Sequence, residues 1–232
     1  MYYGFYYDWT YILVLIGVVL SLLASSQVKG TFAKYSKIRS YSGMTGREAA
    51  EQILRRNGIY DVQVTHIAGN LTDHYDPRNK TLALSDPVYN STSVAAIGVA
   101  AHECGHAIQH ARHYVPLTVR SAIIPAANLG SSLAWPLVLI GLIIPRLNFC
   151  MTIGILLFSL VVILQLVTLP VEFNASRRAI QIIRDSGYLA PDELKGAKSV
   201  LKAAAMTYVA AMVSVSLQLL RLVILRNSRD DN

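Results

Sequence analysis

Two histidines and a glutamate stand close together in the stretch His102-Glu103-Cys104-Gly105-His106 and have the residue types of a metal site. On an α-helix, residues four apart lie on one face a turn apart, so the imidazoles of His102 and His106 can reach one ion. Glu103 lies about 100° around the helix, where its carboxylate can take a proton from a metal-activated water. The stretch therefore predicts a Zn²⁺ centre with two ligands and a general base.

A catalytic zinc ion takes three protein ligands and keeps one position open for water, so the chain must supply a further ligand. We expect this ligand to be Glu172, one of only five glutamates. Two membrane crossings by residues 121–170 would return the chain to the side of His106. The alternative is that Glu172 is a carboxylate at a helix end that pairs with Arg177 or Arg178.

His110 and the segment Asp73-His74-Tyr75-Asp76 hold further potential ligands. His110 would share the ion with histidines four and eight residues before it, a span of about 12 Å along a helix, so we expect an ordinary helix-face residue. Asp73, His74 and Asp76 could form a second metal site. The turn-forming chemistry of this segment explains these residues as well, and we favour the turn.

The metal motif needs a supporting helix, and residues 92–112 have the pattern of one. Val94, Ile97 and Ala101 recur at helical spacing. The residues between them are small and apolar, which lets such a helix be buried on several sides and hold its ligands firmly.

An α+β part, residues 29–120, surrounds this helix. Thr45 and Glu48 have the spacing of a capping box that begins another helix. Residues 61–67 and 81–84 read as two short strands, and we expect them to pair as a small β-hairpin. The strand 81–84 could also offer its edge to an extended substrate.

The composition favours a membrane protein. Hydrophobic residues make up 53% of the chain and charged residues 15%, against roughly 45–50% and 25% in an average soluble domain. The net charge of +7 does not indicate nucleic-acid binding, because the basic residues cluster beside the apolar runs, as in the cytoplasmic flanks of membrane helices. The partners we expect are a lipid bilayer and a polypeptide substrate, and no nucleic acid.

Apolar runs long enough to cross the roughly 30 Å hydrocarbon core occur in three parts of the chain. We expect a transmembrane helix in residues 1–28, a transmembrane hairpin in 121–170 and a last transmembrane helix in 204–232. Basic residues in 29–120 and 171–203 place these two parts in the cytoplasm by the positive-inside rule. The expected fold is mainly α, a multi-pass membrane protein with a zincin-like α+β cytoplasmic catalytic part.

Three motifs together resemble those of the YugP-like neutral zinc metallopeptidases of bacterial membranes, namely residues 71–79 (LTDHYDPRN), 102–109 (HECGHAIQ) and 172–179 (EFNASRRA). The resemblance covers nearly the whole chain. It implies a zinc-dependent membrane endopeptidase of gluzincin type, with His102, His106 and Glu172 as zinc ligands and Glu103 as the base.

A more distant likeness is to membrane proteases whose third-ligand segment reads Glu-x-x-x-Asp, in which the final carboxylate can orient a ligand histidine. Ser176 stands at that position in this chain. The orienting carboxylate is therefore missing there, and Asp73, Asp76 and Asn174 are open alternatives for its role.

The resulting hypothesis is a membrane-embedded zinc endopeptidase whose active site lies at the cytoplasmic face of the cell membrane and acts on protein or peptide chains, including membrane-associated ones. A zinc-activated water would attack the peptide carbonyl, with Glu103 as proton acceptor. Tyr114, His113 and Arg177 are alternatives for the donor to the developing oxyanion.

Two other functions compete with this hypothesis. A non-catalytic zinc-binding scaffold or adaptor would have a closed site with four ligands. A metal transporter could use the helix that Pro125 and Pro136 are expected to kink. The transporter is disfavoured because the apolar runs hold almost no ionisable residues to carry an ion.

Overall fold

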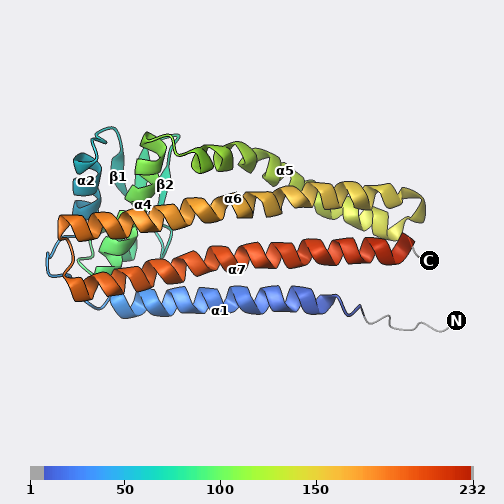
Figure 1. The fold of residues 1–232 in the computed structure, drawn as a ribbon, viewed down its shortest axis with the longest axis horizontal. Coiled ribbons are helices and arrows are strands. Elements are labelled where there is room, and N and C mark those ends of the chain that lie inside the picture. Colours follow the sequence, from blue (N-terminus) through green and yellow to red (C-terminus); the bar gives the residue numbers. More distant parts are fainter. Residues whose placement is uncertain (1–7, 231–232) are drawn as a thin grey trace. The chain divides into compact units, whose positions relative to one another are not determined.

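The computed structural model describes residues 8–230. The elements follow in the order α1 (Tyr11–Tyr35), α2 (Gly46–Arg56), β1 (Gln63–Ile67), β2 (His74–Asp76), β3 (Thr81–Ser85), α3 (Asp86–Tyr89), α4 (Val94–Ala111), α5 (Val115–Ile143), the 3-10 helix η1 (Pro145–Leu147), α6 (Asn148–Ser186) and α7 (Pro191–Asp230) (Figure 1). The chain is mainly helical, as predicted. The first seven residues of the expected first membrane segment lie outside the described residues.

The described chain forms two compact units. We call the first the helical unit, which comprises the residues up to Leu23, Arg120–Val167 and the residues from Tyr208. The second, the mixed unit, comprises Ala24–Val119 and Thr168–Thr207. Their boundaries fall inside the continuous helices α1, α5, α6 and α7.

The mixed unit contains a three-stranded sheet in the order β1-β3-β2. β1 pairs with β3 in parallel, with Gln63 opposite Thr81, so these two predicted strands pair but do not form the predicted hairpin. The hairpin joins β3 to β2, an antiparallel neighbour with His74 opposite Ala83. Residues 74–76 form β2 and not the turn that the surrounding Asp, Pro and Asn residues predict. The actual turn lies between β2 and β3.

The position of β3 rules out the possibility that it offers an edge to a substrate, and leaves the structural role that is commoner for so short a strand. β3 is the central strand, with β1 on one side and β2 on the other, so both of its edges are paired. The edge strands of this sheet are β1 and β2.

The helices of the mixed unit begin and pack as their sequences predict. Thr45 is the N-cap of α2, and both hydrogen bonds of the predicted capping box with Glu48 are present. In α4, Ser93 is the N-cap and the first turns are completely buried. The core around α4 is built from α2, β3 and the parts of α6 and α7 that belong to this unit. The small apolar residues of α4 thus allow burial on several sides.

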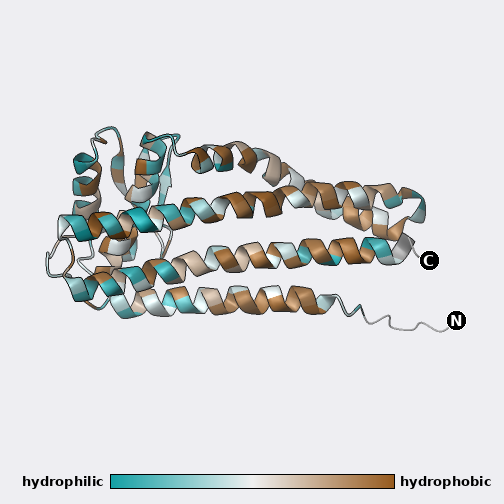
Figure 2. Cartoon of the chain, viewed as in Figure 1, coloured by the Kyte–Doolittle hydropathy of each residue, from teal (hydrophilic) through white to brown (hydrophobic). Residues whose placement is uncertain are grey.

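Four helices are long and apolar enough to cross a membrane: α1, α5, α6 together with η1, and α7. The apolar surface of these segments is visible as long brown stretches in Figure 2. α5 continues through both Pro125 and Pro136. It bends along its length, as expected of a helix that contains proline (Figure 1).

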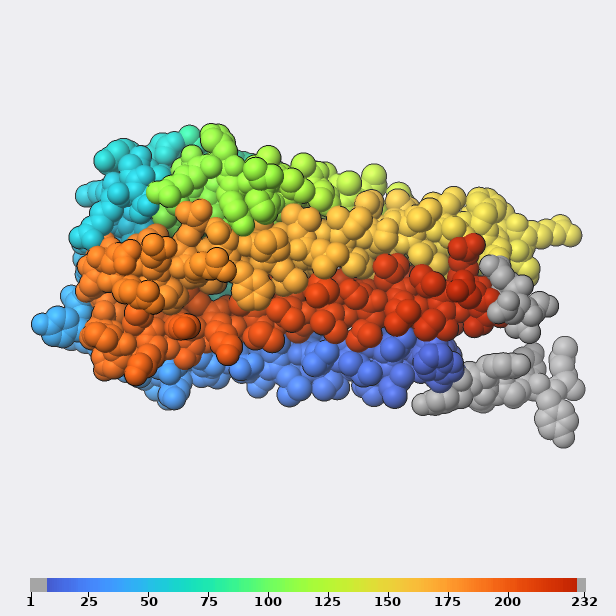
Figure 3. Space-filling model, in the orientation of Figure 1, coloured from blue at the N-terminus to red at the C-terminus, as the bar shows by residue number. Residues whose placement is uncertain are grey.

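Glycines bring α5 and α6 close together in the helical unit. A Cβ atom on Gly141 would lie 2.5 Å from the backbone nitrogen of Met151, and one on Gly154 would lie 2.8 Å from the carbonyl oxygen of Ala134. Small residues allow such close approach between membrane helices. Leu222, near the end of α7, adds to this packing and is buried in a cluster with Phe158 of α6. In this unit α7, coloured red, lies against α6, coloured yellow (Figure 3).

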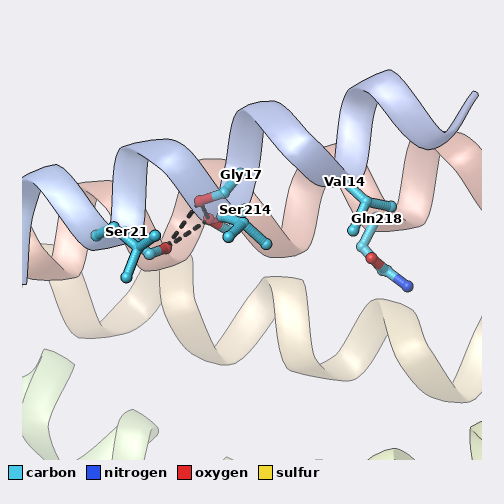
Figure 4. Close-up of a pocket in the computed structure, with 7 residues that line it drawn as sticks. Val14, Gly17, Ser21, Ser214 and Gln218 are labelled. Carbon is cyan, nitrogen blue, oxygen red and sulfur yellow. Dashed lines mark hydrogen bonds between the residues drawn. The ribbon is translucent and has the colours of Figure 1, made fainter.

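Polar contacts join α1 to α7 in the same unit. Ser214 donates a hydrogen bond to the carbonyl oxygen of Gly17 (2.8 Å), and its hydroxyl lies 3.0 Å from that of Ser21 (Figure 4). A pocket of about 290 Å³ adjoins this contact. Near the far end of α7, Arg221 forms an ion pair with Asp8 at 3.0 Å.

Candidate metal centre

The structure brings together the three side chains that we expect to bind zinc. The ligand atoms of His102, His106 and Glu172 all lie within 4.8 Å of one another. Oε2 of Glu172 is 3.3 Å from Nε2 of His102 and 3.4 Å from Nε2 of His106. Two imidazole nitrogens and a carboxylate oxygen that converge in this way are a donor set that zinc prefers, and they leave a fourth position for water.

Close packing of α4 against α6 places these ligands. Gly105, between the two histidines, faces the backbone of α6, and a Cβ atom there would lie 2.7 Å from the carbonyl oxygen of Ala175. Glu172 is only 2% exposed, and its α6 neighbours Val171 and Ala175 are fully buried. The absence of a side chain at Gly105 therefore lets the third ligand reach the two histidines.

Each ligand histidine has a hydrogen-bond partner at Nδ1, the ring nitrogen on the other side from the metal ligand atom. Nδ1 of His102 lies 3.1 Å from the hydroxyl of Ser176, and Nδ1 of His106 lies 3.0 Å from Oε1 of Gln109. Such partners orient the rings of metal-binding histidines. Ser176 thus holds His102 directly at the position where we noted a missing carboxylate.

The three residues proposed to replace that carboxylate make other contacts. Asp73 accepts hydrogen bonds from the backbone and hydroxyl of Ser85, and Asp76 accepts from Arg78 and Asn79. Asn174 accepts from Gln109 instead of a ligand histidine.

The other potential ligands lie apart from this centre. His74 contacts the carbonyl oxygen of Thr72, and His110 contacts the hydroxyl of Tyr75 at 2.9 Å. Within residues 8–230, the one group of three metal-binding side chains is the centre of α4 and α6. Asp73 precedes β2 and Asp76 ends it, and their carboxylates bind Ser85, Arg78 and Asn79, so they stabilise the strand and the turn that follows it.

Glu103 is buried next to the metal ligands and is 7% exposed. Burial raises the pKa of its carboxyl group because it penalises the charged form. His102 and His106 oppose this shift, while Asp73 and Glu172 add to it. A carboxylate with a raised pKa is a stronger proton acceptor, as a general base requires.

Burial and the neighbouring carboxylates shift the pKa of His106 in opposite directions. Burial lowers the pKa of its imidazole, but the hydrogen bond to Glu172 and the charges of Glu103 and Glu172 outweigh burial and raise it. The carboxylates of the centre therefore favour a positive charge between them, which a bound metal cation also supplies.

The oxyanion donor stays a prediction. His113 and Arg177 are exposed and Tyr114 is half-buried. Within the described part of the chain, no hydrogen bond joins these three side chains to the metal ligands. Sequence reasoning also missed the role of Gln109, although its position three residues after His106 places it beside that histidine on the helix.

Proteins similar to this chain are described as zinc metallopeptidases or as a membrane protease, which agrees with the group of His102, His106 and Glu172. Residues 10–227 match the family described as "Putative neutral zinc metallopeptidase". The chain is 48% identical over 221 residues to the "Putative membrane protease YugP" of Bacillus subtilis (strain 168), and the match covers 95% of this chain and 98% of that protein. No solved structure is significantly similar to the chain.

Proposed function

Because the chain belongs to the family of neutral zinc metallopeptidases, we propose that it is a membrane-embedded endopeptidase that hydrolyses peptide bonds. The convergence of His102, His106 and Glu172 beside Glu103 is the observation that carries this proposal. A structural zinc ion in a scaffold protein would need a fourth side-chain ligand. Residues 8–230 bring three together, which favours the enzyme.

The chain's own residues divide the work of the proposed reaction. His102, His106 and Glu172 hold the zinc ion, which supplies Lewis-acid chemistry by acidifying a water molecule and polarising a carbonyl group. Glu103 accepts a proton from the attacking water and later delivers it to the leaving amine. Ser176 and Gln109 keep the two imidazole rings in place during these steps.

We place the proposed active site on the cytoplasmic side, where it acts on protein chains that approach along the membrane. The distribution of charge supports this orientation, because basic residues in the mixed unit flank the apolar segments: Lys29, Lys34, Lys37, Arg39, Lys195, Lys198 and Lys202. The continuity of α6 supports a site near the membrane, since one helix runs from the apolar segment through Glu172 to Ser186.

Replacement of the base tests the proposal. Glu103→Gln keeps the size of the side chain and removes its ability to accept a proton, so we expect unchanged zinc content and a loss of peptide cleavage of at least about 100-fold. Cleavage of a model peptide and zinc content are measured on the purified protein. Glu51→Gln, which alters a half-buried carboxylate paired with Arg47, is the matched control. Wild-type cleavage by Glu103→Gln would disprove the mechanism.

A further inference from the structure

Gln109 has a completely buried side chain (0% exposed) with a hydrogen-bond partner for each end of its amide. On α4 it contacts His106, and on α6 it contacts the carbonyl oxygen of Val171 and the side chain of Asn174. A buried amide is costly unless its hydrogen bonds are made, so the choice of glutamine here needs a reason.

The partners on α6 determine which way the amide points. The backbone carbonyl of Val171 can only accept, so the NH2 group of Gln109 must face it, at 2.8 Å. The same NH2 group donates to Oδ1 of Asn174 at 3.0 Å. Oδ1 of Asn174 is an acceptor on independent grounds, because it also receives a hydrogen bond from Nε of Arg178, which can only donate. The other end of the amide, Oε1, therefore faces His106.

This orientation fixes the tautomer of His106. Oε1 of Gln109 can only accept, so Nδ1 of His106, 3.0 Å away, must carry the hydrogen. A neutral imidazole with its hydrogen on Nδ1 has its lone pair on Nε2. Nε2 is the atom that lies 3.4 Å from Oε2 of Glu172 in the candidate centre. Gln109 thus selects the form of His106 that can bind a metal with this atom.

The amide of Gln109 is also linked to the third ligand, Glu172, by a hydrogen bond to the α6 backbone. Val171, whose carbonyl oxygen accepts from Gln109, immediately precedes Glu172. A hydrogen bond to this carbonyl fixes the turn of α6 from which the Glu172 side chain leaves. The Gln109 side chain of α4 therefore helps to orient one ligand on each helix, His106 on α4 and Glu172 on α6.

We propose that Gln109 is the positioning residue of the zinc centre, where it sets the tautomer of His106 and fixes the turn of α6 that carries Glu172. The inference rests on the zinc centre of the proposed function but not on the peptidase reaction. It acts through the ligands, since Gln109 itself touches neither the metal position nor a substrate.

Zinc affinity of a Gln109→Met variant tests the inference. Methionine has a similar volume but neither donates nor accepts in this place, so we expect the Kd for zinc to rise by about 10- to 100-fold. Kd is measured by competition with a chromogenic chelator, and the visible absorption of the cobalt-substituted protein should change because the ligand geometry changes. Gln52→Met, at an exposed position of α2, is the control and should match the wild type. A wild-type Kd and cobalt spectrum in Gln109→Met would overturn the proposal.

A second variant serves if Gln109→Met does not fold by circular dichroism. Asn174→Ala removes one of the two acceptors that hold the amide, at a half-buried position, and leaves Val171 in place. We expect its Kd for zinc to rise by about threefold, less than for loss of the whole amide. An unchanged Kd would contradict the role of this hydrogen-bond network.

These measurements distinguish failure of the proposed peptidase function from failure of the proposed role of Gln109. Wild-type protein that binds zinc tightly and cleaves no peptide would remove the proposed function and leave the role of Gln109 intact. Unaltered zinc binding by Gln109→Met, with cleavage that still depends on Glu103, would remove the role of Gln109 alone.

Discussion

Both ligand histidines are held at Nδ1 by neutral groups, a hydroxyl for His102 and an amide oxygen for His106. A carboxylate at these positions would add negative charge and make the imidazoles stronger donors to the metal. In this centre the carboxylates are Glu172, a proposed ligand, and Glu103, the proposed base. The two rings are therefore oriented without a further carboxylate behind them.

Removal of the hydroxyl beside His102 tests its part in this arrangement. Ser176→Ala leaves the His102 ring without its partner at Nδ1, so we expect zinc affinity to fall by about tenfold, at the lower end of the range for such partners. Chelator competition measures the change. Ser199→Ala, which removes a hydroxyl bonded to Lys195 of its own helix, should leave the affinity unaltered. Equal affinities in the two variants would show that Ser176 does not orient the ligand.

The sequence predicts the three side chains that converge in the centre, but it does not predict the hydrogen-bond partners of the two histidines. His102 and His106 are set by helical periodicity, and Glu172 is expected from a hairpin predicted to return the chain to the side of His106. The contact of Ser176 with His102 and those of Gln109 with α6 depend on the rotational register of α6 against α4, which no local pattern contains. The orienting carboxylate is missing at position 176, as the sequence indicates, and the hydroxyl of Ser176 takes its place because the helices are close.

At the scale of elements, the centre depends on how closely two helices approach. α4 supplies two of the proposed ligands and the proposed base, α6 supplies the third ligand, and at Gly105 the two backbones are so close that a Cβ atom would not fit. Small displacements between packed helices change ligand positions directly, because tightly packed interiors transmit strain.

A methyl group at this point should therefore disturb the centre. The Cβ atom of Gly105→Ala would lie 2.7 Å from a backbone oxygen that cannot rotate away, so the helices must separate. We expect a stability loss of about 1–3 kcal/mol from overpacking and a weaker zinc affinity. Thermal unfolding and chelator competition report the two effects. Gly30→Ala in α1, where a Cβ atom meets nothing within 4 Å, is the control, and if Gly105→Ala behaved like it the close contact would be unimportant.

The elements themselves differ in how far sequence predicts them. The capping box of α2 and the helix α4 are local patterns, and both appear as predicted. The sheet is not local, because β3 inserts between β1 and β2 and pairs in parallel with the strand that precedes both. Three-residue β2 is too short to show alternation, so pairing with β3 decides its conformation.

For the whole molecule, the helical unit accommodates the one arginine near the end of the last apolar run. Arg221 is paired with Asp8, donates a further hydrogen bond to the hydroxyl of Thr10 and lies over the ring of Tyr11 at 4.1 Å. Paired in this way, its charge can lie in an apolar helix. The pair also joins the beginning of α1 to the end of α7 within the helical unit.

The orientation proposed for the active site predicts the accessibility of single cysteines to a membrane-impermeant maleimide. The native thiols, Cys104 and Cys150, are both buried, which gives a low background. Tyr41→Cys, at a position 87% exposed in the mixed unit, should react only after the membrane is opened. Arg146→Cys, in the short link between α5 and α6, should react in intact cells. The physical reason is the positive-inside rule, which retains the lysine-rich flanks in the cytoplasm. The opposite pattern would place the zinc centre outside and require substrates that reach it from there.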